Sequence, residues 1–531
     1  MWHNLTPGRC QVVLPVMPDI RWVMLCLIAI GSPALFPILT FAQSPSLPPD
    51  QVRQLTERLD ALESENAAVR ADNSRLESFI RGRFPDFAKG ATGGACVPGS
   101  LQSGMQTRFQ ITTEQNAVPS SMMPAGKPDS RFLEGVVNEK LVPRYDNGFV
   151  LMESSDSERM PFRLVAGNFA QIRYTNTQLD SLTYVDHLGN VRPVDPRNDI
   201  SFNRDLLTFS GYAYDPSLKY NIIVWSSGSL ASVVVAGGIT YEYSKAFALS
   251  GGYNGLPGSR SMLGGFKELE GLDRSMADTF FRPGFTQGVW ATGEPVDSVF
   301  YNVMIGNSLN TLQINASKID VNMAYSGSVW WEPWGSYGVA YNDLEKHANP
   351  AIRLGSCFTR AREDRFSDES VATPDNVQLY NSDGVLFFST GAFAPGVTVL
   401  LADYTMWAID AGYKYNGFAM NGQYFFRWLN NFRTDGPVPI DSTFDNGFEA
   451  SIGYFFHPKV ELYARTSFVF GQFQDSHEYC GGFNWYPYEN RGLRVCGEVG
   501  RVDSSPVGNI ITPYQAGMSG WMFLLQAQLN F

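Results

Sequence analysis

The sequence predicts an all-β transmembrane barrel of about 16 antiparallel strands, preceded by an α-helical coiled coil. The 531-residue chain is only 17% charged, against about 25% in an average soluble domain, and 14% aromatic. Beyond the N-terminus it has no run of about 18 uninterrupted apolar residues, which a membrane-spanning helix requires. From about Gly148 to the end, apolar and polar residues alternate with a period of two, as in strands between lipid and water.

The N-terminal residues predict export. Residues 22–42 are apolar, follow Arg21 and end in Thr40-Phe41-Ala42, the spacing of a signal-peptidase site. We therefore expect residues 1–42 to be a signal peptide. An uncleaved membrane anchor is the alternative, although Gly31, Pro33 and Pro37 interrupt the helix that it needs.

Residues 50–82 predict a coiled coil. Seven of nine core positions in the heptad register are apolar: Val52, Leu55, Leu59, Leu62, Asn66, Val69, Asn73, Leu76 and Ile80. Because no other helix is predicted nearby, we expect the segment to pair with copies of itself rather than with its own domain. The two Asn residues are compatible with a dimer or a trimer. Residues 83–147 lack periodicity and predict a linker.

Residues 148–531 predict the barrel, and the last strand shows the alternation best. In residues 520–531, Trp521, Leu525 and Leu529 share one face with other apolar residues, whereas Gln526 and Gln528 share the other. A soluble sandwich alternates too. A barrel is favoured because the connections alternate between short turns, such as Asn416-Gly417, Pro458-Lys459 and Tyr488-Glu489-Asn490, and longer loops. We expect the short turns at the periplasmic end.

Four segments carry a resemblance to a known family. They are residues 205–212 (DLLTFSGY), 281–290 (FRPGFTQGVW), 483–487 (FNWYP) and the C-terminal strand. In these the chain resembles the phosphate-selective porin O and P family, particularly its longer relatives with an N-terminal coiled coil. The resemblance covers about residues 150–531. It implies homotrimers of 16-stranded barrels in a bacterial outer membrane, each with its own pore, and a periplasmic coiled coil shared by three chains.

Charges on the expected lumen face depart from that family, whose phosphate selectivity depends on a ladder of Arg and Lys. The predicted inward residues are nearly balanced in sign: Arg353, Lys414, Arg427, Arg465 and Arg494 against Asp410, Glu449, Glu461 and Glu498. Phosphate specificity is therefore not carried over.

A constriction is expected in residues 254–283, which lie between two strand-like segments. They carry charges of both signs: Arg260, Lys267, Arg274, Arg282, Glu268, Glu270, Asp273 and Asp278. Folded inward, this loop would screen solutes by size and charge. A solvated external loop is the equal alternative.

Cys480 and Cys496 are equally distant from Tyr488, the centre of a predicted turn. They would then face each other, so a disulfide is possible in an oxidising compartment. Free or differently paired thiols are the alternative, because a shifted turn breaks the pairing.

The function predicted is a passive porin for small hydrophilic solutes or ions, with outer-membrane lipid and other copies of the chain as partners. The alternative is a structural or adhesive barrel that conducts nothing. With 40 basic and 52 acidic residues, nucleic acid is not an expected partner. The chain lacks GxSxG, HExxH, P-loop and GxGxxG motifs and Cys/His clusters, so we expect no enzyme activity, metal or cofactor. A soluble periplasmic β enzyme is a weaker third possibility.

Overall fold

The computed structural model describes residues 144–154, 160–228, 232–309, 322–365, 379–508 and 511–531. The predicted signal peptide and coiled coil, and the linker up to residue 143, lie outside the described residues.

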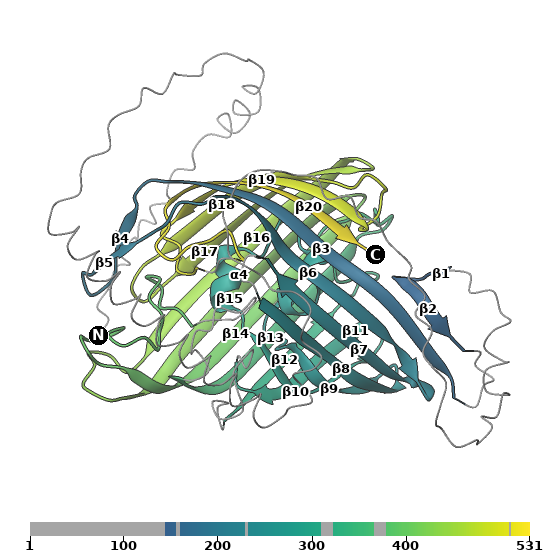
Figure 1. Ribbon diagram of the computed structural model, residues 1–531, viewed down its shortest axis with the longest axis horizontal. Helices are drawn as coiled ribbons and strands as arrows, with labels where there is room; N and C mark the ends of the chain where they lie inside the picture. The colour runs from purple at the N-terminus through teal and green to yellow at the C-terminus, as the bar shows by residue number, and fades with distance from the viewer. Residues whose placement is uncertain (1–143, 155–159, 229–231, 310–321, 366–378, 509–510) are drawn as a thin grey trace, which may run out of the picture. The chain divides into compact units, whose positions relative to one another are not determined.

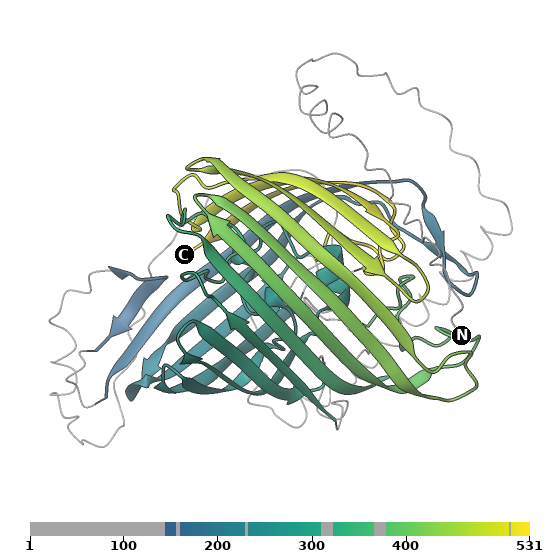
Figure 2. The ribbon, with the colours of Figure 1, turned by 180° about the vertical axis from the view of Figure 1, so that it is seen from behind.

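Sixteen long strands of the described residues form one closed antiparallel barrel, as Figures 1 and 2 show. Each pairs with the next along the chain, and the last pairs with the first, so the sheet has no free side. The prediction of a barrel of about 16 strands is therefore confirmed. The strands are β3 (Phe162–Leu179), β6 (Asn198–Ala213), β7 (Asp215–Ser227), β8 (Ser232–Ser244), β9 (Phe247–Gly255), β10 (Phe285–Val296), β11 (Val299–Asn307), β12 (Met323–Trp331), β13 (Ala351–Asp364), β14 (Val399–Tyr415), β15 (Phe418–Thr434), β16 (Thr443–His457), β17 (Val460–Phe470), β18 (Ser476–Trp485), β19 (Leu493–Asp503) and β20 (Gly520–Asn530).

Shorter elements decorate the barrel. The hairpin of β1 (Arg144–Tyr145) and β2 (Phe149–Glu153) pairs with the first residues of β3, beyond the end of β20. A second hairpin, β4 (Thr183–Val185) and β5 (Val191–Pro193), lies between β3 and β6. Between β9 and β10 lie η2 (Arg260–Met262), η3 (Phe266–Glu268) and α4 (Met276–Phe281). None of the helices in the described residues is long and apolar enough to cross a membrane.

The two faces of the wall follow the alternation in the sequence. In β20, Trp521, Leu525 and Leu529 point outward and remain about half exposed, whereas Gln526 and Gln528 point inward and are buried. The strands β14, β17 and β19 show the same predicted phase. A period of two therefore sorts apolar side chains to the outside and polar ones to the lumen.

The connections differ between the two ends of the barrel. At the end where Phe531 lies, β14 joins β15 through Asn416-Gly417, whose φ angles of 47° and 83° suit a tight two-residue hairpin. Most connections at this end are as short, and we call it the short-turn end; the other is the long-loop end. One connection contradicts the expectation of short turns. Residues 332–350, between β12 and β13, are long and fold into the barrel, burying Tyr337 and Asp343.

The turn between β18 and β19 corrects the cysteine prediction. It spans residues 486–492, so Cys480 lies opposite Gly500, and Cys496 lies opposite Asn484. The register is displaced by four residues from the one that placed the cysteines face to face. The predicted disulfide is therefore wrong, and both thiols are free and buried.

This register makes a chemical prediction. Protein unfolded in denaturant without a reductant should be alkylated by iodoacetamide at Cys357, Cys480 and Cys496, because none of the three is bonded to another cysteine. Peptide mass spectrometry reads the three adducts, with a reduced sample as the control. Recovery of a peptide pair linked through Cys480 and Cys496 would contradict the register.

Candidate constriction of the lumen

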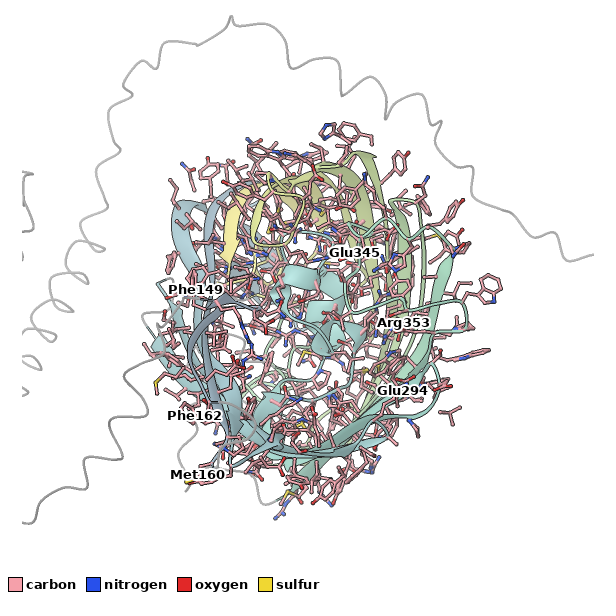
Figure 3. All side chains as sticks on the ribbon, turned by 90° about the vertical axis from the view of Figure 1, so that its right-hand side faces the viewer. Phe149, Met160, Phe162, Glu294, Glu345 and Arg353 are labelled. Atoms are coloured by element: carbon pink, nitrogen blue, oxygen red, sulfur yellow. The ribbon has the colours of Figure 1, made fainter. Side chains whose placement is uncertain are left out.

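The connection between β9 and β10, residues 256–284, folds into the barrel. Leu272, Met276 and Phe281 in this loop are almost fully buried, and α4 contacts β15, β16 and β17. In Figure 3, which faces the short-turn end, its helical turns lie inside the ring of strands. Of the two alternatives for the predicted constriction loop, the structure shows the inward one.

Buried donors and acceptors of the wall hold the loop backbone. Arg494 donates to the carbonyl oxygens of Leu269, Glu270 and Gly271 at 3.0, 2.7 and 2.8 Å. At the start of α4, the Met276 N–H donates to the Glu478 carboxylate at 2.9 Å. Because each bond replaces the water that a buried polar group has lost, these contacts fix the loop across the lumen.

Asp273 forms the central ion pair between loop and wall. Its carboxylate lies 2.9 Å from Arg173 on β3 and 3.1 Å from Arg204 on β6, and all three side chains are about 99% buried or more. Burial alone would raise the pKa of Asp273, but the two guanidinium groups outweigh it and lower that pKa. The carboxylate is therefore ionised, and it balances the charge of two arginines that have no access to water.

The wall residues predicted to face inward do so. Each belongs to a strand in the predicted phase and is buried, or partly buried for Glu449. Most are paired: Arg353 with Asp410 at 2.9 Å, Arg427 with Asp445 at 2.8 Å, and Arg465 with Glu498 at 2.8 Å. Lys414 and Arg494 donate instead to loop carbonyls, and Glu461 accepts from Asn342 and Asn484.

Some inward charges were not predicted from the sequence. Arg173, Arg204, Asp445 and Glu478 are buried partners of the residues above. Arg204 escapes a parity argument because the register of β6 against β3 shifts between Gln171 and Ile172, leaving an extra residue in β6. A bulge of this kind exchanges the two faces of a strand. Asp445 and Glu478 do keep the parity of their strands, and that signal could have found them.

The charged loop residues lie in different surroundings. Arg260, Arg274 and Arg282 are buried inside the barrel, and Arg274 lies 3.6 Å from Asp278. Lys267 and Glu268 lie 3.9 Å apart, and the lysine side chain is 42% exposed. Arg260 packs against two aromatic rings, with its guanidinium carbon 4.2 Å from the ring centre of Tyr341 and 5.1 Å from that of Tyr337.

A small polar cavity lies where loop and wall meet. Its volume is about 30 Å³, and its lining includes Arg260, Glu270, Asp278, Tyr341 and Glu449. This space holds about two water molecules. Four of these side chains have buried polar atoms without a hydrogen-bond partner in the described part of the chain: Arg260 Nη1, both oxygens of Glu270, Asp278 Oδ1 and Tyr341 Oη. We call this cavity the central chamber.

Glu270 adjoins a second carboxylate, that of Glu461. Burial raises the pKa of Glu270 well above its usual value, and the neighbouring charge of Glu461 raises it further. The folded barrel therefore keeps a proton on Glu270 at a pH where the unfolded chain releases it.

Comparisons with known proteins add little. No family model and no curated protein matches the chain. Among solved structures, it is similar to outer-membrane expressed OmpT of Vibrio cholerae, at 13% identity and a TM-score of 0.44 over 71% of this chain and 99% of that chain. It is also similar to an anion-selective porin from Comamonas acidovorans (10%, 0.45, 70% and 100%) and to OmpF of Salmonella typhi in complex with daunomycin (11%, 0.43, 72% and 100%). At these identities and TM-scores the likenesses carry no argument about function.

The central ion pair predicts a stability effect. Asp273→Asn should lower the free energy of unfolding by about 3 kcal/mol or more, because Arg173 and Arg204 then keep buried charges without a carboxylate. Urea unfolding of the purified protein in detergent, followed by tryptophan fluorescence, measures this. Asp297→Asn is the matched control, since that side chain is 99% exposed. Equal midpoints for the two variants would contradict the assignment.

The Glu270 proton predicts a pH dependence. The raised pKa means that wild-type stability falls as the pH rises above the ordinary carboxyl value of 4.5. Glu270→Gln cannot ionise, and its amide can still donate a hydrogen bond to Glu461. It should therefore be more stable than wild type at pH 8, by about 1 kcal/mol, and lose this advantage near pH 4. Unfolding midpoints at both pH values test it, with Glu489→Gln in an exposed turn as the control. A Gln variant less stable than wild type at pH 8 would refute the prediction.

Proposed function

We propose that the chain is an outer-membrane porin, a passive diffusion channel for small hydrophilic solutes or ions. The observation that carries the proposal is the closed barrel itself, whose outer face is apolar while its interior holds ionised side chains around an inward loop. Outward residues include Ile172, Ile222, Val235, Ile305, Phe358, Ile409, Ile452, Leu462 and Leu525, each about 40% exposed or more. Such a surface suits lipid, and the predicted signal peptide supplies export.

The charge arrangement supports a general channel rather than a phosphate channel. Phosphate recognition needs cations free to bind an anion. In the described lumen, Arg173, Arg204, Arg353, Arg427 and Arg465 are all occupied by carboxylates of the protein. We therefore propose weak ion preference and selection mainly by size.

We also propose that the barrel is a homotrimer, with the coiled coil of residues 50–82 in the periplasm. A polar group on the outer wall supports self-association. Asp205 on β6 shares the outward face with Asn168 on β3 and Ser226 on β7, and lies 2.7 and 3.5 Å from their side-chain atoms. A carboxylate is costly on a lipid-facing surface but is accommodated where another copy of the chain covers it.

A closed structural barrel is the second candidate. The inward segments favour it, because residues 256–284 and 332–350 both occupy the lumen and share a buried contact at Arg260. The two functions differ in one measurable property, the passage of ions through the barrel.

Single-channel recording in a planar bilayer separates the two functions. The purified protein should give small, ohmic steps in KCl, because water and ions pass the constriction without a conformational cycle. Heat-denatured protein is the control. The protein should also remain with the outer membrane through a salt wash. Absence of conductance at every voltage would refute the porin proposal and leave the structural barrel.

A further inference from the structure

Residues 332–350 form a crossing segment inside the short-turn end of the barrel. Lys414 on β14 donates to the Tyr337 carbonyl at 3.0 Å, and the Tyr337 hydroxyl donates to Asn421 on β15 at 2.6 Å. Farther along the segment, Asn342 donates to Glu461 on β17 at 2.9 Å. Glu345 forms an ion pair with Arg491 in the β18–β19 turn. The segment is thus held to the wall on both sides of β16.

The wall is shaped to receive this segment. A Cβ atom at Gly412 would lie 2.6 Å from the Tyr337 hydroxyl, so only glycine leaves room for the tyrosine ring at that point of β14. Tyr337 is 1% exposed. The ring is therefore built into the lumen rather than resting at its mouth.

The crossing segment meets the inward loop at Arg260. Tyr337 accepts a hydrogen bond from Arg260 Nη2 at 3.2 Å, and both Tyr337 and Tyr341 place their rings beside the guanidinium. In addition, the Tyr341 N–H donates to the Glu268 carbonyl at 2.9 Å. One segment enters from each end of the barrel, and the two tyrosines join them.

The central chamber lies at this junction. Arg260 and Tyr341 are part of its lining, together with Asn421 and Glu449 on the wall. Arg260 has no ion pair among the residues that the structure describes, so the two aromatic rings and the Tyr337 hydroxyl determine where its guanidinium lies. Cation–aromatic contacts of this kind stabilise a desolvated arginine.

We propose that Tyr337 and Tyr341 are the specificity-determining residues of this barrel, because they fix both inward segments around a chamber of about 30 Å³. The inference rests on the proposed porin function and names its solutes. These are monovalent inorganic ions and polar molecules of a few heavy atoms, such as glycerol, which cross after small displacements of the lining. Saccharides are excluded.

The test compares variants in planar bilayers and in a liposome-swelling assay. Wild type should conduct KCl and pass glycerol but not glucose or sucrose. The variant carrying Tyr337→Ser and Tyr341→Ser should conduct severalfold more and admit glucose, because the segments are no longer joined. Trp334→Ser is the matched control, since this aromatic residue of the same segment is 61% exposed. Tyr341→Phe is a second control, because the Tyr341 hydroxyl has no partner in the described residues.

The outcomes separate the two proposals. If wild type conducts and the double variant behaves identically, the tyrosines do not set the limit and this inference is wrong, while the porin function stands. Glucose uptake through wild type also overturns it. If neither protein conducts, the porin function itself fails. A silent wild type with a conducting double variant supports the tyrosines as the residues that limit passage and identifies the barrel as closed at rest. Circular dichroism verifies folding, and Tyr341→Ser alone replaces the double variant if that one does not fold.

Discussion

The pairing of β20 with β3 is the constraint on which the rest of the structure depends. In a sheet that faces lipid, every backbone N–H and C=O must find a partner within the protein, and only closure provides this at the last strand. Phe531 completes the seam by exchanging two backbone hydrogen bonds with Asn168. Beyond it, β2 pairs with the part of β3 that β20 does not reach. Closure defines an inside and an outside, and the period of two then distributes the side chains.

Closure also explains why the interior is organised by charge. Side chains that point inward in neighbouring strands are brought close together, and there is little water among them. Ionised groups in such a space need partners. Arg173, Arg204 and Asp273 form one such unit, and Arg465 with Glu478 and Glu498 forms another. The loop between β9 and β10 is inserted because it supplies both a carboxylate and backbone carbonyls to arginines of the wall.

Much of the barrel was predictable, and the exceptions have physical causes. The strand alternation is local, so β14, β17, β19 and β20 could be phased from the sequence alone. The extra residue in β6 reverses parity and hid Arg204, and the long turn after Trp485 displaced the register of the two cysteines. Composition could not decide whether residues 256–284 fold inward, because that depends on Arg494 and Glu478, more than 190 positions away. The crossing segment of residues 332–350 was missed since only its tertiary contacts distinguish it from an external loop. The predicted family resemblance has no support from any family model.

The seam carries a consequence for biosynthesis. Gln171 on β3 bonds to Gln528 on β20, a separation of 357 positions along the chain. The first strand of the barrel must therefore wait, with one edge unpaired, until nearly all of the polypeptide has been translated and exported. Unpaired edges recruit other chains and aggregate. A nascent chain of this protein thus depends on a holding factor that covers the β3 edge, and its expression level is limited by the supply of that factor.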